Sequence, residues 1–279
     1  MPLTVTVLVE NRTTQPDLAR ARGLSLFLDD GERRVLFDTG PDARLIGHAA
    51  RLGVDLAAVD TIVLSHGHYD HSGGLPALAD WYAARGLRPR LIAHPGAFVR
   101  RRVLLGLGRW RWSLRELGAP LSLDEAQARF DLHLSATPHG LAGGRMHFLG
   151  HIARLPAYRG GRRLGWKQAY HGMAPDDIDD DSGLVWQGKD GLVVISGCAH
   201  SGICNLTEAA RAATGDAAVQ AVLGGFHLRS AGPFDLWRTR TYFRQLGAPR
   251  VAACHCSGWG RYWLPAREDI ATGSRLTFN

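Results

Sequence analysis

The stretch TIVLSHGHYDHSGG, residues 61–74, begins as a short apolar run and continues into a dense cluster of histidine, aspartate and glycine. The run Thr61–Leu64 predicts a buried strand because it is apolar and rich in β-branched side chains. Four potential ligands follow within six residues: His66, His68, Asp70 and His71. A regular strand would send His71 to the opposite face from the other three, whereas a loop can turn all four toward one centre. Glycines within and after the cluster permit the backbone conformations that such a loop needs.

These side chains indicate a metal site. Imidazole and carboxylate groups suit Zn²⁺, Fe or Mn²⁺. Four ligands this close in sequence do not fit comfortably around one tetrahedral ion, which favours two adjacent ions. The alternative is a polar turn whose histidines are satisfied by ordinary hydrogen bonds.

The sequence on the N-terminal side predicts an α/β fold. Its patterns predict strands at Leu3–Val9, Leu24–Leu28, Arg34–Phe37 and Arg90–Ala93, and helices over Pro41–Leu52 and Pro76–Arg85. The Asp-Asp-Gly-Glu segment at 29–32 predicts a hairpin turn between two of these strands. Alternating strands and helices are typical of layered α/β proteins.

The last third of the chain returns to the same alternation. We expect strands at Gly191–Ile195, Ala218–Leu223 and Arg250–Ala253, and helices over Ile203–Ala213 and Phe234–Leu246. Each of the three strands is followed closely by a histidine, namely His200, His227 and His255. Sites in α/β sheets form at the carboxyl ends of strands, so these histidines are candidates for the same site.

The middle of the chain, about residues 97–181, has no clear periodicity. It is rich in arginine and glycine and contains the pair Trp110 and Trp112. We expect an insertion or cap within a single domain that spans residues 1–279. The tryptophans could face a partner or cover the site, so the sequence leaves the oligomeric state open.

The pattern His-x-His-x-Asp-His after a strand, preceded by Asp-Thr-Gly at 38–40, resembles the metallo-β-lactamase superfamily. Further segments resemble its branch named for 7,8-dihydropterin-6-methyl-4-(β-D-ribofuranosyl)aminobenzene-5′-phosphate synthase. They are HGHYDHSGGL (66–75), SGCAHSGI (196–203), GGFHL (224–228) and CHCSG (254–258). The resemblance covers nearly the whole chain and implies an α/β fold, an αββα sandwich with a two-metal site at the edge between its sheets.

The resemblance also implies a ligand for each position around two ions. The first ion would be held by His66, His68 and His200, and the second by Asp70, His71 and His255. Asp38 is implied as the carboxylate that orients a ligating imidazole through its free ring nitrogen; otherwise it caps a turn. We expect two divalent metal ions, with zinc as the first candidate and iron or manganese as alternatives.

The chain departs from the wider family where many members have a Thr-Gly-Asp motif with a bridging aspartate. Ser196-Gly197-Cys198 stands at that place. Cys198 is therefore expected beside the metals, and either its thiol or water replaces the bridging carboxylate, unless Cys198 is a small packed residue. His227 follows two glycines and is a ligand, a general acid or substrate contact, or a structural histidine.

The charge of the chain suggests an acidic substrate. Lys and Arg total 33 against 26 acidic residues, and nine arginines without an acid lie between Arg85 and Arg115. We expect Arg100, Arg101 and Arg102 to bind a small anionic substrate, because guanidinium groups pair with phosphate and carboxylate. The alternatives are a solvated face or an interface. Nucleic acid is not an expected partner, since no recognisable RNA-binding module accompanies the basic charge.

The cysteines and the chain's start suggest the compartment. Four cysteines all lie in the last third: Cys198, Cys204, Cys254 and Cys256. The start lacks the pattern of a signal peptide, and no apolar run nears the roughly 20 residues of a membrane span. We expect free thiols in a cytoplasmic protein without membrane contact.

These inferences together predict a metal-dependent hydrolase. A metal-bound hydroxide would attack an ester, lactone or phosphoester, because paired ions lower the pKa of a shared water. Asp70 and His227 are the expected catalytic groups beside the metals. A transferase acting on a pterin or ribosyl-phosphate substrate would use the same site. The alternatives are a non-catalytic metal-binding or redox-sensing protein, and a nuclease.

Overall fold

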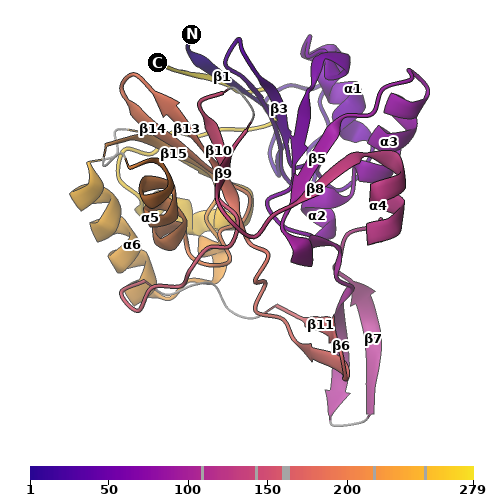
Figure 1. Ribbon diagram of the computed structural model, residues 1–279. Coiled ribbons are helices and arrows are strands. Elements are labelled where there is room, and N and C mark those ends of the chain that lie inside the picture. The colour runs from indigo at the N-terminus through magenta and orange to yellow at the C-terminus, as the bar shows by residue number, and fades with distance from the viewer. Residues whose placement is uncertain (108–109, 142–143, 159–163, 216–217, 248–249) are drawn as a thin grey trace.

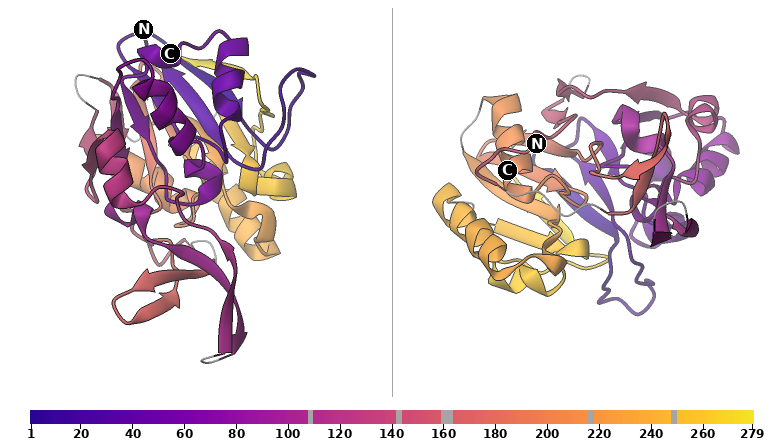
Figure 2. Two further views of the ribbon diagram at one scale, coloured as in Figure 1. Left: turned by 90° about the vertical axis from the view of Figure 1, so that its right-hand side faces the viewer. Right: turned by 90° about the horizontal axis from the view of Figure 1, so that it is seen from below.

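The computed structural model describes residues 1–107, 110–141, 144–158, 164–215, 218–247 and 250–279. Two large β-sheets stack against each other, and helices cover both outer faces (Figure 1). A small third sheet projects from one end of this body (Figures 1 and 2). The two chain termini lie close together at the opposite end.

The first large sheet carries the predicted N-terminal strands. Within the described residues it has seven strands, in the order β17 (Arg275–Phe278), β1 (Leu3–Val9), β2 (Ser25–Asp29), β3 (Arg34–Phe37), β4 (Thr61–Val63), β5 (Arg90–Ala93) and β8 (Asp131–Leu134). In the β2–β3 turn, the carboxylates of Asp29 and Asp30 accept backbone N–H groups of the turn. β3, β4, β5 and β8 run parallel, so the carboxyl ends of β3 and β4 lie at the same edge.

The second large sheet carries the strands of the last third. Its six strands in the described part of the chain follow the order β16 (Arg250–Cys254), β15 (Val219–Gly225), β14 (Gly191–Ser196), β13 (Gly183–Gly188), β10 (Met146–Phe148) and β9 (His139–Gly140). β14, β15 and β16 are parallel. β14 is buried on both faces: Val193 and Ile195 enter the core between the sheets, while Leu192 and Val194 pack under helices. This explains its uninterrupted apolar sequence.

Helices complete a four-layer αββα sandwich, which confirms the predicted fold. The first sheet is covered by α1 (Arg44–Arg51), α3 (Leu75–Ala83) and α4 (Leu123–Arg129), and the second by α5 (Ile203–Thr214) and α6 (Pro233–Leu246). α1 begins later than predicted from Pro41, because Asp42 accepts the Arg44 N–H in a preceding turn. No helix in the described residues is both long and apolar enough to cross a membrane.

The small projecting sheet is built from two hairpins that are distant in sequence. Its described strands are β6 (Arg101–Leu107), β7 (Trp110–Glu116), β11 (Trp166–Ala169) and β12 (Gly172–Pro175). Other elements of the stretch 97–181, namely α4 and β8–β10, belong to the main body. A cap within one domain stays a proposal, and these two hairpins are the candidates for it within residues 97–181. Trp110 and Trp112 are exposed on them.

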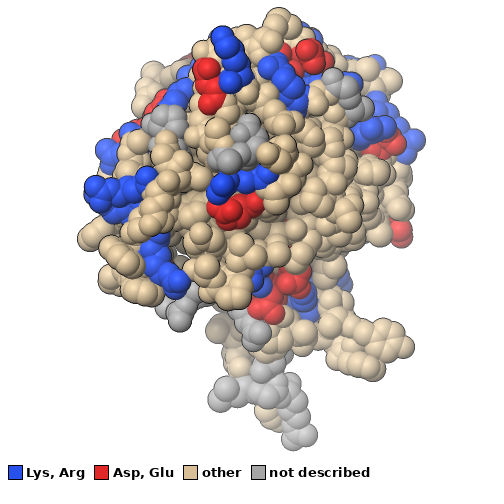
Figure 3. All heavy atoms as spheres, turned by 60° about the vertical axis from the view of Figure 1, so that its left-hand side comes forward, with Lys and Arg blue, Asp and Glu red and all other residues tan. Residues whose placement is uncertain are grey.

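The basic charge does not form a continuous band on the face shown in Figure 3. Basic and acidic side chains are interspersed there among uncharged residues. Several arginines of the predicted cluster are paired with acids, as in the contacts of Arg90 with Asp131 and Arg102 with Glu116. Arg109 lies outside the described residues.

Candidate metal centre

The carboxyl ends of five strands converge at one edge of the sandwich. β3 leads into Asp38, β4 into His66, β14 into Cys198 and His200, β15 into His227, and β16 into His255. At four of these turns a residue other than glycine has a left-handed backbone: Asp38, Ala199, His227 and His255, with φ of 57°, 51°, 51° and 50°. Each such conformation costs of order 1–3 kcal/mol and is typical of functional sites.

One group of donors consists of His66, His68 and His200. Their donor atoms all lie within 4.8 Å of one another, and all three side chains are buried. His66 Nε2 stands 2.9 Å from His68 Nδ1. Neither ring nitrogen of His200 has a hydrogen-bond partner, nor does His68 Nε2.

A relay of hydrogen bonds fixes the tautomer of His66. The Ser65 hydroxyl donates to Asp38 Oδ2 over 2.7 Å, so its oxygen is left to accept from His66 Nδ1–H over 2.9 Å. His66 Nε2 consequently carries a lone pair that faces the other donors. Outer carboxylates and hydroxyls orient metal-binding imidazoles in this way.

A second group consists of Asp70, His71 and His255, again with donor atoms within 4.8 Å of one another. His71 Nδ1 donates to Asp38 Oδ2 over 2.6 Å, and His255 Nδ1 donates to Asn11 Oδ1 over 3.1 Å. The two Nε2 atoms therefore point inward and lie 3.2 Å apart. Asp70 Oδ2 is 3.6 Å from His255 Nε2.

Burial and neighbouring charges divide the histidines electrostatically. Burial lowers the pKa of His66 and His200 well below the ordinary value and lowers that of His68 to about 3. Burial opposes protonation of His71 too, but the Asp38 and Asp70 carboxylates outweigh it and raise its pKa to about 9. The site thus offers neutral imidazoles beside a place where positive charge is strongly favoured.

This donor set fits divalent cations. Leaving a buried polar atom without a partner costs about 1–3 kcal/mol, yet unpaired ring nitrogens occur on both His200 and His227, whose rings lie side by side. A cation that accepts their lone pairs would remove that cost. The nitrogen-rich set with one carboxylate suits zinc, iron or manganese.

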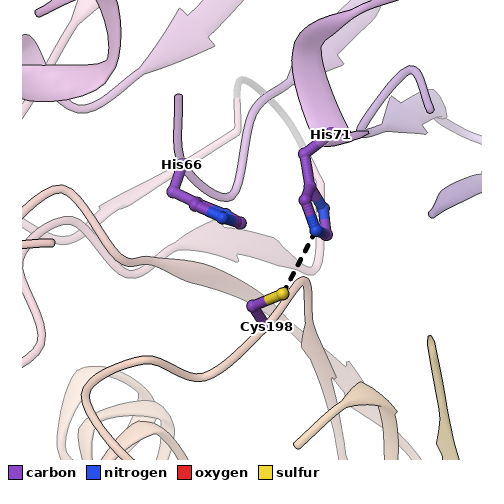
Figure 4. A group of neighbouring side chains, drawn as sticks. All are labelled: His66, His71 and Cys198. Carbon is purple, nitrogen blue, oxygen red and sulfur yellow. Dashed lines mark hydrogen bonds between the residues drawn. The ribbon is translucent and has the colours of Figure 1, made fainter. Parts of the chain in front are cut away.

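Cys198 lies at the junction of the two groups. Its sulfur is 3.2 Å from His71 Nε2, and Figure 4 shows Cys198 approaching His66 and His71 from the opposite side. Burial raises the pKa of its thiol well above the ordinary value. The preceding Gly197 permits this contact, because a Cβ there would lie 1.9 Å from Ser65 Oγ.

His227 stands on the other side of His200. The centroids of the two rings are 4.5 Å apart. Its backbone N–H donates to Cys256 Sγ over 3.2 Å, and its Nδ1 has no partner. This places the ring at the wall of the site.

Arg101, one of the residues expected to contact substrate, makes buried ion pairs in the structure. Arg101 is buried, and its guanidinium binds Asp176 over 2.7 Å and Asp180 over 2.5 Å. Asp180 in turn accepts the Gly67 N–H between His66 and His68 over 2.8 Å. Through Asp180, Arg101 therefore stabilises the ligand loop, which is the segment His66–His71 that carries four of the candidate metal donors. Physically, its one guanidinium satisfies two buried carboxylates.

A cavity of about 570 Å³ opens onto the donors. Its lining includes His68, His200, His227 and His255 from the site and Val103, Leu117 and Leu164 from the base of the projecting sheet. Three arginines also line it: Arg22, Arg115 and Arg229. Arg100 and Arg102 are not among its lining residues, and both lie close to Glu116 instead.

Sequence patterns did not point to Asn11, to Ser65 or to the role of Asp180. Asn11 could have been noticed, because a polar pair, Glu10 and Asn11, directly follows β1 at the edge where the site forms. Glu10 accepts the His255 N–H over 2.8 Å. Asp180 lies more than a hundred residues from the loop it holds, and no local pattern reveals that contact.

The chain resembles known proteins in sequence and in fold. The sequence model of a family described as "Metallo-beta-lactamase superfamily" matches residues 20–153. A 7,8-dihydropterin-6-methyl-4-(beta-D-ribofuranosyl)-aminobenzene-5′-phosphate synthase of Methanocaldococcus jannaschii is 27% identical over 236 residues, covering 82% of this chain and 76% of the relative. An uncharacterized protein of the same organism is 27% identical over 264 residues, covering 91% of each chain.

A solved structure resembles this chain in fold over nearly its whole length. A metal-dependent hydrolase of the β-lactamase superfamily superposes with a TM-score of 0.80 at 25% identity, covering 98% of both chains. The αββα layers, the ligand-rich loop after β4 and these matches lead to one conclusion. The chain is similar to the metallo-β-lactamase superfamily, in sequence over residues 20–153 and in fold across its length.

Proposed function

We propose that this protein is a metal-dependent hydrolase that cleaves an anionic ester at a site for two divalent cations. His66, His68 and His200 would hold one cation, and Asp70, His71 and His255 the other. The observation that carries the proposal is the convergence of two sets of inward-facing donors on one cavity. Zinc is the first candidate, with iron or manganese as alternatives.

The chain's own residues would prepare the site for this reaction. Cations bound there would supply Lewis acidity and lower the pKa of a bound water. Asp38 and Asn11 hold His71 and His255 in the orientation and tautomer that present Nε2. His227 lines the cavity, where its ring can pass a proton to a leaving group.

The cavity supports an anionic substrate. Arg22, Arg115 and Arg229 approach it from three separate segments, and guanidinium groups bind phosphate bidentately. Arg115 also lies over the Tyr69 ring at 4.5 Å, which positions its charge at the cavity wall. Their place in the cavity lining supports Arg22, Arg115 and Arg229, rather than Arg100–Arg102, as the proposed substrate contacts.

The similarity to the synthase supports a second candidate, a group-transfer reaction on a phosphate-bearing substrate. That relative's name specifies a ribofuranosyl phosphate. The same cavity would have to exclude water from the reacting centre and admit a second substrate. A hydrolase needs one substrate alone, so product analysis with and without an added acceptor separates the two.

The test combines metal content with activity. Protein purified without chelator should contain close to two divalent ions per chain and hydrolyse p-nitrophenyl esters of phosphate, phosphodiester or carboxylate type. His66→Ala and His71→Ala should each lower metal content and remove nearly all activity. His171→Ala is the matched control, because His171 is exposed on the projecting sheet.

Two results would contradict the proposal. One is protein that neither retains nor takes up divalent ions at neutral pH. The other is full activity in both His66→Ala and His71→Ala, since each removes a donor from a different group.

A further inference from the structure

We propose that the thiolate of Cys198 is a metal ligand shared by both cations. This inference rests on the two-cation site proposed above and adds a sulfur to its nitrogen and oxygen donors. It assigns a function to a buried thiol that stands among ring nitrogens rather than among apolar side chains.

The sulfur lies within reach of donors from both groups. Cys198 Sγ and the donor atoms of His66 and His71 are within 4.8 Å of one another. The same limit holds for Cys198 with His200, and for Cys198 with His255. His66 and His200 belong to one group, and His71 and His255 to the other. An atom placed between two groups in this way is suited to bind both ions.

The distance between Cys198 Sγ and His71 Nε2 fits coordination of one ion by both side chains. Zinc binds thiolate at about 2.3 Å and imidazole at about 2.0–2.1 Å. At angles from about 95° up to the tetrahedral angle, two such donors of one ion stand about 3.2–3.6 Å apart, so 3.2 Å corresponds to the narrow end of that range. The distance from Cys198 Sγ to His71 Nε2 is 3.2 Å.

The backbone around Cys198 is arranged to bring the sulfur there. Gly197 lets the end of β14 press against Ser65, where any Cβ would collide. Ala199 then adopts a left-handed conformation, with φ of 51°. This turn allows Cys198 and His200, two residues apart, to line the same cavity.

The chemistry of sulfur defines which ions this site would take. When an ion binds, the S–H bond is lost, a sulfur–metal bond forms and the proton passes to solvent. The thiolate and Asp70 together offset part of the charge of two dications. A soft donor favours zinc, cobalt or ferrous iron over magnesium and calcium.

X-ray absorption at the metal edge tests this directly in the wild-type protein. The probe is protein loaded with two equivalents of Zn²⁺ or Co²⁺. A shared thiolate gives, on average, one sulfur neighbour per metal ion at about 2.3 Å. A thiolate bound to one ion alone gives half a sulfur per metal, and no metal–sulfur contact gives none. Either of the last two results overturns the proposal.

Cysteine variants then identify the sulfur. With Co²⁺, the wild-type protein should show a thiolate-to-cobalt charge-transfer band. The variant Cys198→Ser should lack this band and should bind both ions at least tenfold more weakly. Cys256→Ser should keep the band, as should the control Cys204→Ser on α5. Retention of the band in Cys198→Ser, or its loss only in Cys256→Ser, overturns the assignment.

These outcomes are separable from those of the proposed function. Protein that binds no metal contradicts both proposals. Protein that binds two ions without sulfur, and is active, contradicts the thiolate ligand alone. If Cys198→Ser fails to fold, the sulfur count in the wild type still decides.

Discussion

Replacing Arg101 by methionine should destabilise the protein severely, because it leaves two buried carboxylates without their cation. Methionine keeps much of the apolar stem and removes the guanidinium that binds Asp176 and Asp180. Both acids are buried, and burial already raises the pKa of Asp180. Removing one partner of a buried ion pair costs about 3–5 kcal/mol. That is a large fraction of the roughly 5–15 kcal/mol that stabilises a typical domain.

Urea unfolding of chelator-treated protein, followed by circular dichroism, measures this cost. Arg100→Met is the matched control, because Arg100 is exposed and 3.9 Å from Glu116. An exposed pair contributes about 0–1 kcal/mol, so the control should unfold close to wild type. Metal affinity should fall only in Arg101→Met, since Asp180 holds the Gly67 N–H of the ligand loop. A loss in Arg101→Met no larger than in Arg100→Met would refute this account of the buried arginine.

Three further predictions concern the site itself. Asp38→Asn should weaken metal binding about 10–100-fold, as measured by calorimetric titration, because it loosens the orientation of His71. An unchanged metal affinity would show that Asp38 does not orient a metal-binding histidine. In chelated protein, the raised pKa of His71, about 9 against 6.5 for an ordinary histidine, stabilises the fold fully below pH 6.5, and that stabilisation is lost as pH rises toward 9. Urea midpoints at pH 6 and pH 9 should show this decline in wild type and a flatter profile in Asp38→Asn; equal slopes would contradict it. Arg115→Ala should raise KM for an anionic ester and weaken its salt dependence, whereas Arg102→Ala should leave both unchanged, and the reverse order would return the substrate contact to Arg102.

Local patterns predicted the strands, and the candidate donors could be chosen because they lie in the segments that follow apolar strands. His66, His200 and His255 could be placed at one edge once β4, β14 and β16 were recognised. β14 and β16 belong to one parallel part of a sheet, so their carboxyl ends share an edge, whereas β4 lies in the other sheet and reaches that edge through the stacking of the two sheets. The structure shows this convergence for all three.

Long-range pairing explains what the sequence did not reveal. Arg101 stands in a run of arginines that looked solvated or substrate-facing. Its partners, Asp176 and Asp180, are 75 and 79 positions away, and no periodicity connects them. The projecting sheet was obscured for the same reason, since β6 pairs with β11 across the part of the chain that rejoins the main body.

The left-handed turns at the strand ends limit which substitutions these positions tolerate during evolution. Asp38, His227 and His255 hold that conformation with side chains that the site uses, so glycine there would relieve the backbone and lose the chemistry. Ala199 contributes only a methyl group. Left-handed alanine costs roughly 1–2 kcal/mol, and the flexibility that glycine adds to the unfolded chain costs roughly 0.5–1 kcal/mol. The two effects oppose each other and leave a difference of about 0.5–1 kcal/mol in favour of glycine, so position 199 is the one of the four where exchange between alanine and glycine removes no side chain that the site uses.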